Sequence, residues 1–214
     1  MTNPQPHSVR AERRLRELEL RRADLITAAL AVFAAKGFDG AQVAEIATAA
    51  ELSTKSLYAL FSSKAELYQE VIRSAAEAMR DTVQTQVDSI EDPREQLLSL
   101  IDSLFSCFDE HEDLLRLYAH STQGLPWKVR QNLGEPSLHI FQDFTSWVIE
   151  ITSRAKQQGY LQALDPESVA VAIVGTVTTS AARWIEQPET GPVSAVSPAV
   201  RAIFERILED RGQK

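Results

Sequence analysis

The sequence predicts an all-α protein with a small N-terminal helical unit and a larger C-terminal one. Apolar residues recur every three or four positions along most of the chain, and strand-like alternation is scarce. Only 8 glycines and 9 prolines interrupt the 214 residues. With 44% hydrophobic residues, the chain can bury one large or two small cores.

The first 22 residues divide into a polar tail and an arginine-rich segment. Residues 1–9 contain two prolines and are expected to be disordered. Leu15 and Leu18 then keep a helical spacing among charged residues. Two interpretations remain open: a solvated helix with internal ion pairs, or a basic arm for phosphates or a minor groove. The arginines are Arg10, Arg13, Arg14, Arg16, Arg21 and Arg22.

A helix is predicted from about residue 22 onward. Leu25, Ala29 and Phe33 recur at helical spacing and form an apolar face. Lys36 and Gly37 predict its end, because a basic last turn followed by glycine is a common helix stop.

Two short helices follow in close succession. Asp39 and Gln42 have the spacing of a capping box before the first of them, and Ser53 is a favourable N-cap for the second. The buried stripe of the first is expected at Val43, Ile46, Ala47 and Ala50. Two short helices joined by about three or four residues form a helix-turn-helix.

The second helix of such a pair can enter the major groove of DNA. Leu57 and Phe61 mark its buried side, so the residues between them should be exposed. Their hydroxyl and ammonium groups can donate hydrogen bonds to phosphates and base edges. The predicted DNA-binding residues are Thr54, Lys55, Ser56 and Tyr58, with Gln42 and Lys64 at flanking phosphates.

Five motifs fall in order over about fifty residues: Gly37-Phe38, Val43-x-x-Ile46-Ala47, Ala50-x-Leu52-Ser53, Leu57-Tyr58-x-x-Phe61 and Ser63-Lys64-x-x-Leu67. Together they resemble the DNA-binding domain of TetR-type transcriptional regulators. The resemblance implies a helix-turn-helix DNA-binding domain at 10–67 and a helical ligand-binding and dimerisation domain at 68–214. It also implies a homodimer on a palindromic double-stranded DNA operator, acting as a repressor that a small-molecule ligand releases.

Four positions depart from the usual pattern of that family. Glu51 stands where glycine is usual, which costs free energy if the turn requires a positive φ. Ala41 replaces the threonine that usually opens the second helix, and Ser56 replaces a common glycine. Leu60 cannot make the phosphate contact that histidine or tyrosine makes there.

The rest of the chain predicts a helical bundle. Asp92 and Pro93 are suited to a helix N-cap and first turn, Gly159 to a helix end, and Asp165 with Pro166 to another start. The segment from about 136 to 158 has apolar residues on too many sides for one stripe, so this helix should be central. The expected helices cover about 64–90, 93–108, 110–121, 127–133, 136–158, 165–186 and 198–209.

Residues 169–182 carry no charge, and a helix that is apolar or small all round must be buried on both sides. One side can face its own domain and the other a second subunit, which makes this helix the best candidate for a twofold interface. The alternative is a helix buried wholly inside one subunit. The predicted interface residues are Val169, Ala172, Ile173, Val177, Ile203, Phe204 and Ile207.

Aromatic and polar residues in the C-terminal part can line a pocket for a small apolar or aromatic ligand. Such pockets usually exceed about 300 Å³ and have a few polar contacts. The competing interpretation is that aromatic residues at helical spacing only pack the core. The candidate ligand-binding residues are Phe105, Phe108, Tyr118, His120, Trp127, Phe141, Phe144, Trp147, Thr176 and Thr179.

Neither catalysis nor a cofactor is predicted. The four histidines make no metal-binding spacing, and no phosphate-binding glycine loop or nucleophile motif is found. Cys107 is the only cysteine and is expected to be a core residue, with a redox role as the alternative. No apolar run approaches the roughly 20 residues of a membrane span, so a cytoplasmic protein without a membrane partner is expected.

The net charge of −8 does not oppose DNA binding, because of where it lies. Residues 1–70 hold nine Lys/Arg and nine Asp/Glu, so the whole excess belongs to 71–214. Local charge governs phosphate affinity. We therefore expect a DNA-binding transcriptional regulator; the alternative is a helical ligand-binding or scaffold protein that no longer binds DNA.

Overall fold

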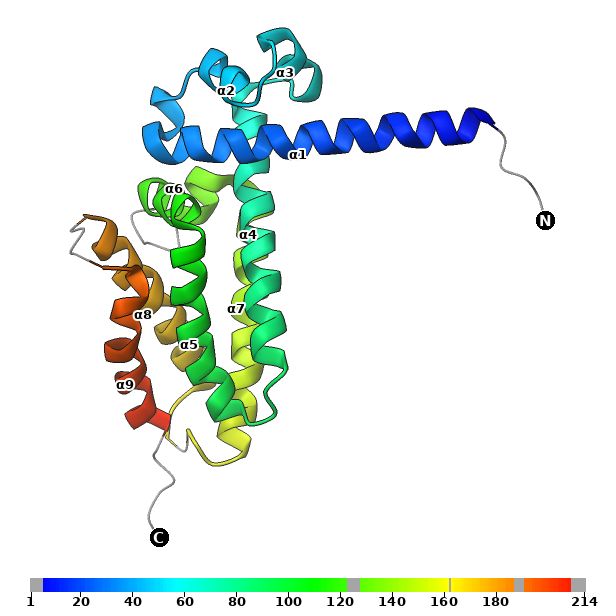
Figure 1. The fold of residues 1–214 in the computed structure, drawn as a ribbon. Helices are drawn as coiled ribbons and strands as arrows, with labels where there is room; N and C mark the ends of the chain where they lie inside the picture. Colours follow the sequence, from blue (N-terminus) through cyan, green and yellow to red (C-terminus); the bar gives the residue numbers. More distant parts are fainter. Residues whose placement is uncertain (1–5, 123–127, 162, 187–190, 209–214) are drawn as a thin grey trace. The chain divides into compact units, whose positions relative to one another are not determined.

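The computed structural model describes residues 6–122, 128–161, 163–186 and 191–208 (Figure 1), with side chains undescribed at 6–9, 120, 121 and 128–134. Every regular element in these ranges is a helix, which confirms the all-α prediction. The chain divides into two compact units, Met1–Val71 and Ile72–Lys214.

The first unit contains α1 (Pro6–Gly40), α2 (Val43–Ala49), α3 (Thr54–Leu60) and the start of α4 (Lys64–Asp88). Helix α1 begins at Pro6, so the predicted disordered tail was wrong for residues 6–9, while 1–5 lie outside the described residues. Gly37 breaks the helical geometry with φ 69° and ψ 176°, a conformation almost confined to glycine. The predicted helix stop is confirmed.

A tight apolar core fixes α2 and α3 against α1 and α4. Ile46 and Leu57 are completely buried, and Phe33 meets Tyr68 edge to face at 4.9 Å between ring centroids. The N-cap of α2 is Gln42 rather than the predicted Asp39. The backbone N–H of Gln42 donates a hydrogen bond to the Glu45 carboxylate at 3.4 Å. The Lys36 ammonium, 2.8 Å from Glu45, lowers the pKa of that carboxyl.

Arg22 joins three parts of the first unit. Its guanidinium lies 4.3 Å above the centre of the Phe61 ring and donates to Glu70 on α4 at 3.0 Å. A cation over an aromatic face and a charge-assisted hydrogen bond both favour this placement. The side chain thereby connects α1, the end of α3 and the first turns of α4.

Glu51 occupies the turn between α2 and α3 with φ 55°. A side chain in this left-handed region costs about 1–2 kcal/mol, whereas glycine adopts it freely. Allowing for the greater entropy of glycine in the unfolded chain, Glu51→Gly should raise the free energy of unfolding by about 0.5–1 kcal/mol. Urea denaturation measures this, with Glu51→Ala as the control that keeps the strain. Equal stability of the two variants would contradict the explanation.

The second unit consists of the rest of α4 with α5 (Pro93–Glu110), α6 (Glu112–Thr122), α7 (Lys128–Gln157), α8 (Pro166–Glu186), the 3-10 turn η1 (Val193–Val196) and α9 (Ser197–Leu208). The Asp92 carboxylate accepts from the backbone N–H of Arg94 and Glu95, as its N-cap prediction requires. Gly159 ends α7 with φ 89°. Helix α5 buries eleven residues, so it is a central element of this unit.

Two predictions about segment boundaries were wrong. Helix α7 continues through Pro136, where a new helix had been expected to start. Proline lacks an N–H, so the helix forgoes one backbone hydrogen bond at that turn. The turn η1 also lies between the helices expected at about 165–186 and 198–209, where no helical turn had been predicted, and its Val193 is buried against the core.

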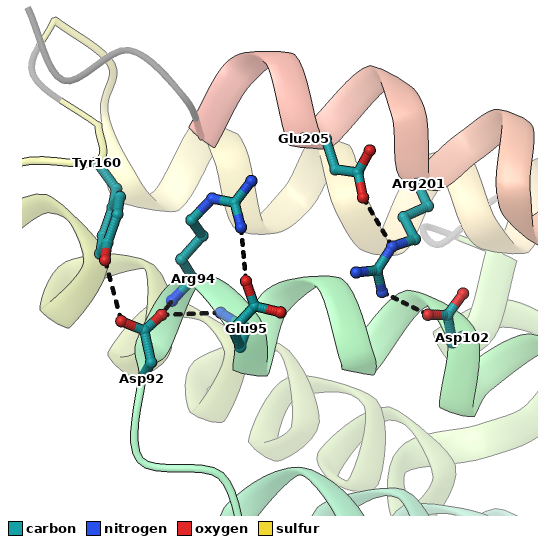
Figure 2. Close-up of polar contacts among 7 residues, drawn as sticks. All are labelled: Asp92, Arg94, Glu95, Asp102, Tyr160, Arg201 and Glu205. Carbon is teal, nitrogen blue, oxygen red and sulfur yellow. Dashed lines mark hydrogen bonds and ion pairs between the residues drawn. The ribbon is translucent and has the colours of Figure 1, made fainter.

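Polar contacts hold later segments onto α5 (Figure 2). The Tyr160 hydroxyl donates a hydrogen bond to the Asp92 carboxylate at 3.0 Å. Burial opposes ionisation of this carboxylate, but hydrogen bonds from the Glu95 backbone N–H, the Tyr160 hydroxyl and the Arg94 backbone N–H outweigh it and hold the pKa of Asp92 below its usual value. Arg201 on α9 donates to Asp102 on α5 and to Glu205. These contacts fix α9 along α5 and so determine which of its faces remains outside.

Helix α8 is apolar on both its buried and its exposed sides. By length and composition it is the single helix, within the described ranges, that meets the criteria for a membrane span, with 44% of the relevant window buried. Core helices meet the same criteria, and Ile173 and Val177 are completely buried among other helices of this unit. The burial of this face among other helices accounts for its apolar residues, while Val171 and Ala172 on the other face are exposed.

The thiol of Cys107 is buried in the core. Burial, and then the Glu110 carboxylate, raises its pKa to about 11. Because the thiolate is the reactive form, native protein at pH 8 should react with iodoacetamide about 100-fold more slowly than the unfolded chain. Labelling followed by mass spectrometry, with and without urea, checks this; similar rates in both states would restore the redox interpretation.

Candidate functional site

The exposed row on α3 forms the first candidate site. Ser53 caps this helix by accepting from the Ser56 backbone N–H at 3.0 Å. Leu57 is completely buried, and this fixes the rotation of the helix. The four predicted residues all face solvent: Thr54, Lys55, Ser56 and Tyr58.

The two residues predicted to contact flanking phosphates differ in the exposure of their side chains. Gln42 is exposed at the start of α2. Lys64 is only partly exposed: its ammonium donates to the Ala41 carbonyl oxygen at 3.0 Å and lies 4.5 Å above the centre of the Phe38 ring. Lys64 therefore has an internal role in joining α4 to the end of α1, which the sequence prediction missed.

The start of α4 is also satisfied within the chain. The Glu66 carboxylate accepts from the Ser62 hydroxyl and, at 2.7 Å, from the Ser62 backbone N–H, and both bonds lower its pKa. The Ser63 hydroxyl in turn accepts from the Glu66 backbone N–H at 3.1 Å. The helix end predicted to meet a phosphate thus already holds a carboxylate, so a phosphate would have to compete with it.

The second candidate site is an apolar cavity inside the second unit. Its volume is about 110 Å³, below the roughly 300 Å³ expected from the sequence. Helices α4, α5, α6, α7 and α8 all contribute to its wall. Its lining is almost entirely apolar, and Arg80 at the wall already donates two bonds to Asp81, at 2.8 and 3.0 Å.

Two hydroxyl groups in the cavity wall have no partner at hydrogen-bond geometry among the side chains that the structure describes: Tyr118 Oη and Ser137 Oγ. Burial raises the pKa of Tyr118, partly offset by the nearby hydroxyls of Thr122 and Thr178. A buried polar group without a partner costs about 1–3 kcal/mol. The cavity therefore contains two places where a polar group of a ligand would be favourable.

The structure separates the predicted ligand-binding residues into three groups. Those that line the cavity are Phe108, Tyr118, Phe141 and Phe144. Those placed elsewhere are Phe105, Trp147, Thr176 and Thr179. The side chain of His120, and Trp127 as a whole, lie outside the described residues.

The predicted residues that do not line the cavity have other contacts or point elsewhere. Phe105 is completely buried in the core, and Trp147 donates its ring N–H to Asp88 at 3.1 Å. On α8 the threonine at the cavity is Thr178, between the two predicted threonines. Its hydroxyl donates to the Val174 carbonyl at 2.9 Å, a backbone contact that no sequence pattern reveals.

The predicted interface residues likewise divide between two faces. Within the subunit core lie Val169, Ile173, Val177 and Phe204, so their assignment to an interface was wrong. Ala172 and Ile203 are exposed, and Ile207 is partly buried. Val171, which the prediction omitted, is 53% exposed beside Ala172. The outer faces of α8 and α9 therefore present apolar side chains to solvent.

Comparison with known proteins places the helices of the first unit in a known family. Residues 25–71 match the family described as bacterial regulatory proteins, tetR family. The chain is similar to the HTH-type transcriptional repressor KstR2 of Mycobacterium tuberculosis, with 26% identity over 179 residues, 84% of this chain and 87% of that protein.

Two solved structures share the fold. A FadR regulator from Bacillus subtilis in complex with stearoyl-CoA has a TM-score of 0.72 at 19% identity, over 87% of this chain and 97% of that one. AibR in complex with isovaleryl coenzyme A and operator DNA has a TM-score of 0.70 at 18% identity, over 86% of this chain and 97% of that one.

Proposed function

Because this chain belongs to the TetR family of bacterial regulatory proteins, we propose that it is a homodimeric repressor released from a palindromic operator by a small ligand. The observation that carries the proposal is the exposed row of Thr54, Lys55, Ser56 and Tyr58 on a helix fixed by the buried Leu57. Acting on chromosomal DNA, it would work in the cytoplasm.

DNA recognition would begin at the amino-terminal end of α3, which enters the major groove. The Lys55 ammonium can donate to a guanine edge, while the Thr54 and Ser56 hydroxyls can reach phosphates or bases. One such helix reads a half-site, so a twofold dimer reads a palindrome. Gln42 is the remaining predicted phosphate contact whose side chain is exposed.

The ligand would occupy the cavity between α4 and α8. A volume of about 110 Å³ holds only part of a larger molecule, so the helices must separate further or the rest of the ligand must lie outside. The apolar wall favours an aliphatic or aromatic group, and the hydroxyls of Tyr118 and Ser137 favour one hydrogen-bonding group on it. The acyl-CoA ligands in the two solved structures make acyl-CoAs the first compounds to test.

Binding-site selection from a random duplex library tests the DNA-binding proposal. If Lys55 reads a base, Lys55→Ala should cost about 1–3 kcal/mol of binding free energy and relax the preference at one base pair of each half-site. Lys36→Ala is the matched control, since it removes the same charge from a lysine paired with Glu45. It should leave the selected sequence unchanged.

Two outcomes would contradict the proposal in different ways. Identical selected sequences for wild type and Lys55→Ala would remove Lys55 from base recognition. A folded wild type that selects no sequence would favour the alternative of a helical ligand-binding protein without DNA-binding activity.

A further inference from the structure

Few cations are free in the part of the first unit that runs from Arg22 to the end of that unit. Residues 22–71 contain four: Arg22, Lys36, Lys55 and Lys64. Arg22 is bound to Glu70, Lys36 to Glu45, and Lys64 to a backbone carbonyl and an aromatic ring. Within the described residues, Lys55 alone among these four makes no ion pair or side-chain hydrogen bond.

One free lysine is little for a protein that binds DNA. Affinity for duplex DNA depends strongly on the number of phosphates that Lys and Arg side chains neutralise, and with 6–10 such contacts it falls by about 10³–10⁵-fold between 50 and 200 mM salt. Backbone N–H groups and hydroxyls add contacts without adding charge. Additional positive charge near α3 would therefore contribute strongly to binding.

Free positive charge is found on the amino-terminal part of α1. Figure 1 shows α1 continuing well past α2 and α3 of the same unit. Here Arg13 pairs with Glu17 at 3.2 Å and Arg16 with Glu12 at 3.9 Å. The remaining arginines of this stretch, exposed and without a described ion pair, are Arg10, Arg14 and Arg21.

These three arginines lie on one face of the helix. At about 100° per residue, Arg10, Arg14 and Arg21 fall within about 40° of one another around the axis. Glu12 and Glu19 lie on the opposite side by the same count. Glu17 lies at the edge of the arginine face, where Arg13 neutralises its carboxylate. The face thus presents three unneutralised positive charges.

We propose that this arginine face, formed by Arg10, Arg14 and Arg21, lies along the phosphate backbone of the DNA bound by α3. The inference rests on the proposed DNA-binding function and decides between the two interpretations left open for this segment. The three residues extend over about 16 Å of helix, at 1.5 Å per residue. Over that length, duplex DNA carries about nine negative charges.

The exposed leucines of this segment do not change the choice of partner. Leu15 and Leu20 are 59% and 66% exposed, and Leu20 lies well away from the arginine face by the same helical count. By the same helical count, a protein partner that covers Leu15 or Leu20 would contact a different side of the helix and would leave the arginine face open. A polyanion satisfies the arginines, and the same unit already carries the reading helix.

The test compares salt dependence on a fluorescent 30-base-pair duplex of mixed sequence, which requires no knowledge of the operator. The triple variant Arg10→Gln, Arg14→Gln, Arg21→Gln should lower the slope of log affinity against log salt by about 2.7 per protomer, at about 0.9 per phosphate contact. The helical circular dichroism should stay unchanged, because all three side chains are exposed.

Two controls isolate the charge. The variant Arg10→Lys, Arg14→Lys, Arg21→Lys should keep the wild-type slope, and so should Glu12→Gln with Glu19→Gln on the opposite face. A triple glutamine variant with the wild-type slope would overturn the inference while leaving the regulator assignment intact. A wild type that binds no duplex even at low salt would overturn both. If Leu15→Gln with Leu18→Gln lowers the oligomeric state and the glutamine variant keeps its slope, the segment is instead a protein contact.

Discussion

Ala172→Arg is expected to convert the proposed dimer into folded monomers. Ala172 is exposed on α8 beside Val171, and Ile203 is 53% exposed on α9. If these faces meet their twofold copies, the new guanidinium enters a dry interface without a partner. Several kcal/mol would be lost, and about 3 kcal/mol already weakens dimerisation by more than 100-fold. Sedimentation over a micromolar concentration series measures this.

The choice of position decides what the experiment reports. Val177 has no exposed surface within its own subunit, so Val177→Arg would unfold the protein rather than separate subunits. Gln157→Arg, which adds the same charge on the exposed surface of α7, should remain dimeric. The interface assignment is wrong if the wild type sediments as a monomer, or if Ala172→Arg remains a dimer.

Phe105→Ala is expected to destabilise the second unit by about 3–5 kcal/mol, the range for removing a fully buried phenylalanine. Phe105 is completely buried and does not touch the cavity. Phe141 lines the cavity and is only partly buried, so Phe141→Ala should cost about 1 kcal/mol. Urea unfolding followed by the tryptophan fluorescence of the second unit distinguishes the two.

The variants Phe105→Ala and Phe141→Ala also distinguish a residue that packs the core from one that lines the ligand cavity. Phe141→Ala should change the affinity for stearoyl-CoA, measured by fluorescence titration, because it enlarges the cavity. Phe105→Ala, examined at a temperature where it stays folded, should leave the affinity close to that of the wild type. If Phe105→Ala alters affinity more than Phe141→Ala, the cavity is not the binding site.

Helical spacing predicted most of the fold because each buried face repeats along its own helix. The N-cap at Asp92 and the helix ends at Gly37 and Gly159 follow from local chemistry, so the sequence predicted them correctly. Pro136 was misread because a proline disfavours helix continuation without preventing it.

The sites were harder to predict because buried residues look alike in sequence. Phe105 and Phe108 share one apolar helix, yet only Phe108 reaches the cavity, since the neighbouring helices decide which positions meet empty space. Lys64 and Lys55 are both polar positions in sequence, but the carbonyl that holds Lys64 belongs to Ala41, a contact across 23 residues. Such partners become visible only in the folded chain.

The contacts of Arg22 have a mechanical consequence for the first unit. The end of α3 is held through Phe61, and the second turn of α4 through Glu70, by one guanidinium on α1. Tilting α3 alone would break the contact with Phe61, and shifting α4 alone would break the contact with Glu70, whereas moving these segments together breaks neither. The unit should therefore respond to a displacement of α4 as a rigid lever, which changes the position of α3 while the shape of the unit stays constant.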